Sequence, residues 1–209
     1  MDGVEAIQSS QAEFELRLRA VRDDQWEWTT PCDEWTVRQL VNHVTAAGQV
    51  YLALIDGCTR DEAAAILERD VLGDNPVADF MRATAAVPDA FRRPGVMGHV
   101  YPHPLQDVPG EQLMWWRAAD NTIHAWDLAR AIGFDEHLNV DLVHTLWTQL
   151  EPAAEWLTQS EMFGQGQSGE LDGTATSQAR LLDLCGRRPG QATNSRRRRP
   201  SAQELCSDA

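Results

Sequence analysis

The chain has 209 residues, a net charge of −14 and an apolar fraction of 43%. This length fits one domain with a sizeable core, and no apolar run reaches the about 18 residues that a transmembrane helix needs. The excess of acidic residues disfavours binding to nucleic acid or to an anionic membrane. The N-terminus lacks the pattern of a signal peptide, so we expect a cytoplasmic protein. All 18 basic residues are Arg, which is typical of a GC-rich genome and favours an actinobacterial source.

The first quarter of the chain predicts two long helices separated by a Trp-rich loop. Apolar residues recur at helical spacing over residues 4–22 and again over 36–55. The second helix begins with a capping box, in which Thr36 is the N-cap residue and Gln39 lies three residues further on. The loop between them, residues 26–35, contains three Trp, and we expect their rings to cover other parts of the protein.

Five further segments carry apolar residues at helical spacing. They are residues 59–68, 76–92, 111–132, 140–160 and 177–185. Pro88 weakens the pattern of the second segment, so this helix should end or bend there. The long helices at 4–22, 36–55, 76–92 and 111–132, with polar loops between them, indicate an all-α bundle.

Residues 94–110 contain four Pro and three Gly, a composition that excludes a helix. A small hairpin near 95–108 is compatible with this composition. His99 and His103 lie four residues apart in this segment. Outside a helix that spacing does not place two side chains on one face, so a wall or lid over a pocket is favoured over metal ligation.

Asp120 and His124 are the residues whose placement most needs an explanation. They lie one helical turn apart, on the same apolar face as Trp116. Burying polar groups without partners costs about 1–3 kcal/mol each, so we expect either a metal ion or a side-chain hydrogen bond between them. His43 lies on or beside the buried stripe of 36–55 and is the best candidate for a third ligand, although a lone His there is usually a hydrogen-bonded core residue.

The cysteines and the C-terminus carry weaker signals. No two of the four Cys are close enough for a CxxC motif, so we expect reduced thiols. Cys32 lies just before a helix, where a partly activated thiol and a small packing residue are alternatives and the second is commoner. We expect one domain over residues 1–189, followed by a disordered tail over 190–209 that contains Arg196–Arg199.

Two long motifs resemble those of a known family. Residues 30–44 (TPCDEWTVRQLVNHV) resemble the opening motif of the DinB-like metal-binding proteins, in particular the mycothiol-dependent maleylpyruvate isomerase N-terminal group. Residues 119–133 (ADNTIHAWDLARAIG) are similar to the second signature of that group. Residues 108–111 (VPGE) and 181–189 (LLDLCGRRP) are also similar, so the likeness spans about residues 5–189.

The resemblance implies a DinB-like four-helix bundle with extra short helices and one divalent metal ion. Zinc is expected first, with nickel or iron as alternatives. The implied ligands are His43 from the second long helix and Asp120 and His124 from the fourth. The resembled isomerases have Glu where this chain has Asp120, so the shorter Asp leaves the activity open.

Five further residues are candidates for the surroundings of this site. They are Asp127, Arg38, Arg130, Trp35 and Trp116. Asp127 would accept a hydrogen bond from a ligand histidine, or alternatively form an ion pair with one of the two Arg. The Arg residues would bind the carboxylate of a thiol cofactor or substrate, or alternatively be exposed on helix faces. The Trp residues would line a pocket.

The resemblance implies a mycothiol-dependent isomerase or S-transferase that acts on a small electrophilic substrate through a metal-bound thiolate. The alternatives are a non-catalytic, metal-stabilised helical bundle that binds a small ligand or protein partner, and a plain structural helical protein. The chain lacks HExxH, P-loop, GxGxxG and GxSxG motifs, which disfavours a protease, NTPase, dehydrogenase or α/β-hydrolase. No residue is identified as catalytic, and a monomer and a homodimer are both compatible with the sequence.

Overall fold

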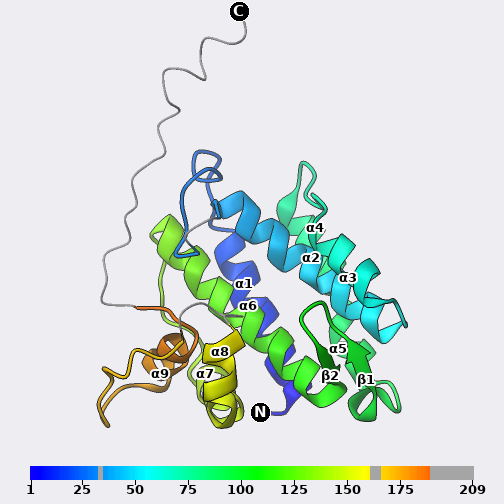
Figure 1. Cartoon of the computed structure of the whole chain (residues 1–209). Helices are drawn as coiled ribbons and strands as arrows, with labels where there is room; N and C mark the ends of the chain where they lie inside the picture. Colours follow the sequence, from blue (N-terminus) through cyan, green and yellow to red (C-terminus); the bar gives the residue numbers. More distant parts are fainter. Residues whose placement is uncertain (33–34, 161–165, 189–209) are drawn as a thin grey trace, which may run out of the picture.

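The structure, a computed structural model, describes residues 1–32, 35–160 and 166–188. Helices dominate this part of the chain, and one small hairpin lies between α5 and α6 in the sequence (Figure 1). In chain order the elements are α1 Gly3–Leu18, α2 Val37–Ile55, α3 Arg60–Leu67, α4 Pro76–Thr84, α5 Val87–Arg92, η1 Val96–Gly98, β1 Val100–Pro102, β2 Asp107–Pro109, α6 Gly110–Ile132, α7 Val140–Leu150, η2 Glu151–Ala153, α8 Ala154–Ser160 and α9 Ser177–Leu184. The predicted tail 190–209, with Arg196–Arg199, lies outside the described residues.

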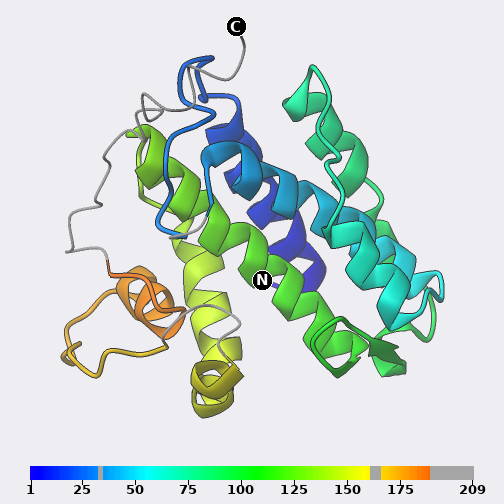
Figure 2. The same ribbon diagram turned by 45° about the horizontal axis from the view of Figure 1, so that its top comes forward.

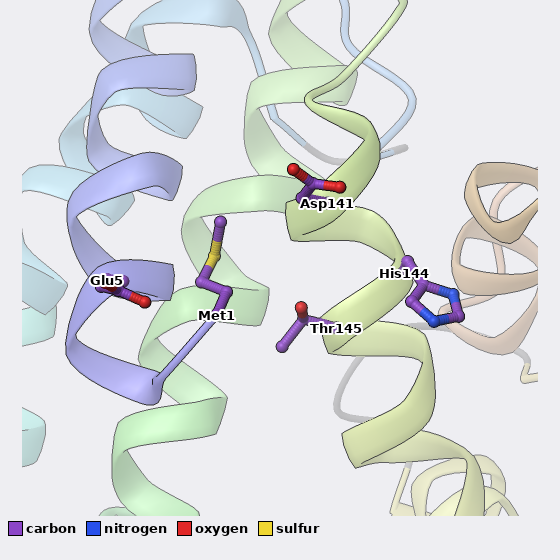
Figure 3. Close-up of a pocket in the computed structure, with 5 residues that line it drawn as sticks. All are labelled: Met1, Glu5, Asp141, His144 and Thr145. Carbon is purple, nitrogen blue, oxygen red and sulfur yellow. The ribbon is translucent and has the colours of Figure 1, made fainter.

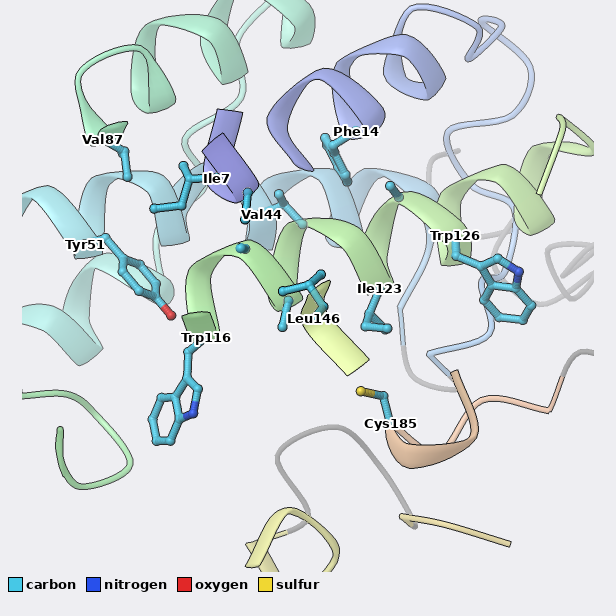
Figure 4. Packing of buried hydrophobic residues seen from close by; sticks show 14 of the residues in the cluster. Ile7, Phe14, Val44, Tyr51, Val87, Trp116, Ile123, Trp126, Leu146 and Cys185 are labelled. Atoms are coloured by element: carbon cyan, nitrogen blue, oxygen red, sulfur yellow. The ribbon is translucent and has the colours of Figure 1, made fainter. Parts of the chain in front are cut away.

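Four rods make up the bundle: α1, α2, the α4–α5 pair and α6. Helix α6 packs along α1 and beside α2, and α4 and α5 pack on the other side of these two helices (Figures 1 and 2). The shared core contains fully buried apolar side chains from every rod, among them Phe14, Val44, Val87 and Ile123 (Figure 4). The predicted all-α bundle is confirmed, and α3, α7, α8 and α9 are the extra short helices.

The N-terminal end of α2 determines where His43 lies. Thr36 has extended backbone angles, its side chain accepts the backbone N–H of Gln39, and the Gln39 side chain accepts the backbone N–H of Thr36. This is the predicted capping box, and it satisfies two N–H groups that a helix start leaves without partners. The helix therefore begins at a defined residue, and His43 lies two turns inside it.

The break expected near Pro88 is present, whereas two other predicted helix boundaries are wrong. Residues 76–92 form α4 and α5, and Pro88 lies in the first turn of α5, where its missing N–H costs nothing. Pro152 converts the middle of the predicted helix 140–160 into the short η2 turn. The first helix ends at Leu18 rather than at residue 22, because the chain turns through Ala20 and Val21.

The predicted hairpin is confirmed as β1 and β2, which pair antiparallel with Tyr101 opposite Val108. It packs against α2 and α6, so it covers one end of the space between these helices (Figure 1). Gly110 leads directly from β2 into α6, and its N–H donates to the carbonyl of His99 at 2.8 Å. A Cβ atom at Gly110 would lie 2.0 Å from the carbonyl oxygen of Val96.

We expect Gly110→Ala to destabilise the protein by about 1–3 kcal/mol, the range for overpacking against atoms that cannot move aside. The obstacle is backbone, because the carbonyl carbon of Val96 would also lie only 2.9 Å away. Urea denaturation measures the change. Gly98→Ala is the matched control, since a Cβ there meets nothing within 4 Å. Equal unfolding free energies for the two variants would contradict the expectation.

In the described part of the chain, no helix has both the length and the apolar character to cross a bilayer.

A pocket lies between the start of α1 and α7 (Figure 3), lined by Met1, Glu5, Asp141, His144 and Thr145. It contains none of the predicted site residues, and its Glu5 carboxylate already accepts the backbone N–H of Asp2.

Candidate metal centre

His43, Asp120 and His124 meet between α2 and α6. Asp120 Oδ1 lies 3.4 Å from His43 Nε2 and 3.4 Å from His124 Nε2. The two imidazole rings are 5.2 Å apart and nearly perpendicular. One donor atom from each residue lies within 4.8 Å of the other two. The structure therefore brings all three predicted ligands together, and we call them the triad.

The antiparallel packing of α2 and α6 creates this meeting point. His43, early in α2, contacts Asp120 in the middle of α6, whereas Tyr51, late in α2, contacts Arg117, which is earlier in α6. The α-helical repeat already places Asp120 and His124 on one face. Only the packing of α2 against that face adds the third side chain.

The donor atoms of the triad fit a divalent ion. Two ligand atoms of a tetrahedral zinc centre, with bonds of about 2.0–2.1 Å, lie about 3.3 Å apart. Both N–O separations in the triad are 3.4 Å. The side chains of His43 and Asp120 are 26% and 16% exposed, so a solute can reach them.

The charges of the triad are strongly coupled. Burial alone would raise the pKa of Asp120, but hydrogen bonds from His124 and His43 hold it well below its usual range. Burial alone would lower the pKa of His124, but hydrogen bonds to Asp120 and Asp127 hold it well above its usual range. The arrangement thus favours a carboxylate facing positive charge, which a divalent cation would also supply.

A buried arginine that the sequence reasoning missed holds Asp120 in place. Arg117 is fully buried on α6. Its Nη1 donates to Asp120 Oδ2 at 2.9 Å, and its Nη2 donates to the carbonyl of Val44 on α2 at 3.1 Å. Because Arg117 occupies Oδ2, Oδ1 is the carboxylate oxygen that faces the two histidines. The only sequence signal was an Arg three residues before Asp120 on an apolar face.

Asp127 contacts the other nitrogen of His124. Its Oδ2 lies 3.0 Å from His124 Nδ1, so Asp127 holds a proton on Nδ1, and a metal ion that replaced the Nε2 proton would meet the Nε2 lone pair on the side of Asp120. Arg187, just after α9, donates two hydrogen bonds to the same carboxylate. Its Nε lies 3.1 Å from Oδ1 and its Nη2 lies 2.7 Å from Oδ2. Asp127 is fully buried, and although burial raises its pKa, Arg187 and His124 hold that pKa well below its usual range.

Cys32 contacts the polar side chains of Arg187, Asp127 and His124, so it is more than a packing residue. Its Sγ lies 3.1 Å from Arg187 Nη2, 3.2 Å from Asp127 Oδ2 and 3.8 Å from His124 Nδ1. Cys32, His124 and Asp127 form a second group whose donor atoms lie within metal-binding distance of one another. The triad faces the opposite ring nitrogen of His124, so the two groups lie on different sides of this imidazole.

Comparisons with known proteins agree with this geometry. Residues 7–129 match the family model of the mycothiol maleylpyruvate isomerase N-terminal domain. The chain belongs to this family. Uncharacterised proteins from two strains of Mycobacterium tuberculosis are 34% identical to it over 142 residues, covering 68% of this chain and 74% of each relative. These relatives are actinobacterial, in agreement with the Arg-only composition.

A solved structure shares the fold of this family member. The crystal structure of the mycothiol-dependent maleylpyruvate isomerase matches with a TM-score of 0.54 at 17% identity. The match covers 75% of this chain and 70% of that chain. The DinB-like all-α fold is therefore confirmed. The family match ends at residue 129, so Arg187 reaches the site from a segment beyond it.

The two predicted Trp residues lie in different places in this family member. The Trp35 ring lies 4.6 Å from the His43 ring and 5.7 Å from the His124 ring, so it covers the triad. Trp116 lies one turn before Asp120 on α6 and is 2% exposed. It packs against the rings of His103 and Trp156 rather than against the triad histidines.

The two predicted Arg residues have other partners. Arg38 forms an ion pair with Asp70 at 2.9 Å on the surface. Arg130 lies over the Trp126 ring at 4.8 Å and 3.4 Å from the carboxylate of Glu136. The ion pair of Asp127 is instead made by Arg187, at a sequence distance that no local pattern reveals.

Proposed function

We propose that this protein is a divalent-metal-dependent enzyme that uses a small thiol, mycothiol, to isomerise or S-modify a small electrophilic substrate. The observation that carries the proposal is the convergence of His43, Asp120 and His124 at a point that solvent can reach. Family membership supports mycothiol as the thiol. The cytoplasmic location and the small-molecule partners expected from the sequence are part of the same proposal.

His43 Nε2, His124 Nε2 and Asp120 Oδ1 would hold the metal ion. Three protein ligands leave a coordination position open, and a divalent ion there lowers the pKa of a bound thiol and polarises a carbonyl group. Two nitrogens and one oxygen suit zinc, with nickel or iron as alternatives. The shorter Asp in place of Glu does not prevent this arrangement, because Asp120 already reaches both histidines at 3.4 Å.

The residues around the triad would keep it ready to bind. Arg117 holds one oxygen of Asp120, and Asp127 holds the Nδ1 proton of His124. The Trp35 ring shields the imidazoles from bulk water on one side. These contacts fix the ligand side chains before binding, which lowers the entropy cost of binding.

Metal analysis of the purified protein, followed by assays of mycothiol with maleylpyruvate and with monobromobimane, tests the proposal. We expect about one zinc ion per chain. We also expect isomerisation of maleylpyruvate, or consumption of mycothiol by monobromobimane, at a rate that depends on the protein and is lost in chelator. Bound zinc without any thiol-dependent turnover would support the non-catalytic, metal-stabilised bundle instead. Protein that binds no divalent ion would overturn both.

Asp120→Asn should weaken zinc binding by at least about tenfold, because an amide oxygen is a much poorer ligand than a carboxylate. Isothermal titration calorimetry of the metal-free protein measures the affinity. Asp120→Glu is the matched control, since it keeps the carboxylate and should retain most of the affinity. A folded Asp120→Asn variant with wild-type affinity would remove Asp120 from the site.

A further inference from the structure

A second group of polar side chains lies along the same pair of helices as the triad. The ring of Tyr51 on α2 lies 6.0 Å from the ring of His103 on the hairpin, and His103 lies edge-on to Trp116 of α6 at 5.4 Å. Figure 4 shows the Tyr51 hydroxyl directed toward Trp116. No step proposed above uses either Tyr51 or His103.

The Tyr51 hydroxyl has no hydrogen-bond partner in the described part of the chain. Tyr51 is 5% exposed, yet among residues 1–32, 35–160 and 166–188 no group hydrogen-bonds its oxygen. In the same part of the chain, the fully enclosed side-chain atoms without partners are Arg17 Nε, Arg117 Nε and Asn121 Oδ1. Tyr51 Oη is not one of them, so it borders open space. A buried phenol normally finds a hydrogen-bond partner, and here that partner would come from a ligand.

His103 offers a second donor. Its Nδ1 accepts the backbone N–H of Leu105, so the ring proton of a neutral His103 is on Nε2. Burial lowers the pKa of His103 to about 4, which keeps the ring neutral. The hairpin fixes its backbone, because His103 N–H donates to the carbonyl of Tyr101 and Arg60 donates to the His103 carbonyl.

Arg117 connects this group to the triad. Its guanidinium carbon lies 5.5 Å from the centre of the Tyr51 ring, and its Nη1 donates to Asp120. Tyr51 lies about two turns after His43 on α2, and Trp116 lies about one turn before Asp120 on the facing helix. Burial raises the pKa of Tyr51 well above its usual range, and Asp120 raises it further, so the phenol remains a donor.

We propose that Tyr51 Oη and His103 Nε2 form the substrate subsite: both donate hydrogen bonds to a carbonyl or carboxylate oxygen of a small planar ligand. The ring of Trp116, stacked on Trp156 at 5.2 Å, supplies a flat apolar wall beside them. Two neutral donors beside an aromatic wall select a planar, oxygen-bearing ligand over an alkyl one. This inference rests on the proposed function and adds to it the residues that would bind the substrate.

The two tyrosines of the chain allow a matched experiment. The Tyr101 hydroxyl donates to the carbonyl of Val96 at 3.2 Å, so it has a structural role, whereas the Tyr51 hydroxyl has no partner among the residues that the structure describes. With maleate as the probe, titration calorimetry should show Tyr51→Phe binding about three- to tenfold more weakly, the loss of one hydrogen bond. Its melting temperature should not fall. Tyr101→Phe should show the opposite: a lower melting temperature and unchanged maleate affinity.

His103 is tested in the same way. His103→Leu should weaken maleate binding to a similar extent, and His103→Gln, which keeps a side-chain N–H donor, should restore part of it. Equal maleate affinities of wild type and Tyr51→Phe, or no maleate binding by wild type, would overturn the inference. So would a Tyr51→Phe variant that loses as much thermal stability as Tyr101→Phe.

Titrations of both the metal-free and the zinc-loaded protein separate this inference from the proposed function. Maleate binding that requires zinc and ignores Tyr51→Phe would overturn the subsite and leave the metal site standing. A protein that binds no zinc but still shows the contrast between the two tyrosines would overturn the proposed function and support the subsite.

Discussion

His43→Ala should purify with less than about a tenth of the wild-type zinc content, because two remaining ligands hold a divalent ion poorly. The folded chain should survive the change, since His43 is partly exposed and its side-chain hydrogen bond to Asp120, at 3.4 Å, is the only one it makes to a described residue. Zinc at 100 times its dissociation constant stabilises wild-type protein by about 2.7 kcal/mol, and this increment should vanish in the variant. Melting curves with zinc and with chelator, together with elemental analysis, measure both effects.

His144→Ala is the control for this experiment. His144 is an exposed histidine on α7 that contacts Ser177. Its removal should leave zinc content and the zinc-dependent rise in melting temperature unchanged. If His43→Ala retains a full equivalent of zinc, the proposed centre is wrong, and the group formed by Cys32, His124 and Asp127 becomes the next place to look.

Arg187→Ala should cost about 3–5 kcal/mol of unfolding free energy in the metal-free protein, because it leaves the carboxylate of Asp127 buried without its ion-pair partner. It should also weaken zinc binding about 10- to 100-fold, since Asp127 would no longer orient the ring of His124. Urea denaturation measures the first effect, and zinc titration of the metal-free protein measures the second.

Two further variants separate the effect of losing the Arg187–Asp127 ion pair from general damage to the C-terminal segment. Arg188→Ala removes the neighbouring arginine, which binds Asp183 and backbone carbonyls, and should leave zinc affinity unchanged. Adding Asp127→Asn to Arg187→Ala removes the uncompensated charge and should recover much of the lost stability. Wild-type zinc affinity in Arg187→Ala would show that the guanidinium has no role in positioning His124.

Local sequence signals predicted the helices well and their ends less well. The capping box at Thr36 and Gln39 predicted the start of α2 to within a residue, because the same side chains that stop the chain from fraying also define the first turn. Pro88 predicted the break between α4 and α5, whereas Pro152 interrupts a helix that apolar periodicity had predicted as continuous. Periodicity records which face is buried, and that face continues across a break in the hydrogen-bond ladder.

The residues expected around the triad lie in different kinds of place. Trp35 lies over the triad as expected of a pocket residue, but Arg38 pairs with Asp70 at the surface. Long, charged side chains choose among several partners within reach, and that choice depends on which elements fold back against them. Helix periodicity says only which way such a side chain points.

By itself, the sequence predicted the helices, the hairpin and the placement of Asp120 and His124 on one helix face, because all three depend on residues that are near one another in the chain. A resemblance to known motifs added His43 as the expected third ligand. Only the tertiary structure decided what surrounds this centre. Arg187 contacts Asp127 although 60 positions separate them in the sequence, and the Tyr51 ring on α2 lies near the His103 ring on the hairpin. Such contacts leave no periodic trace in the sequence, since they depend on how separate elements pack.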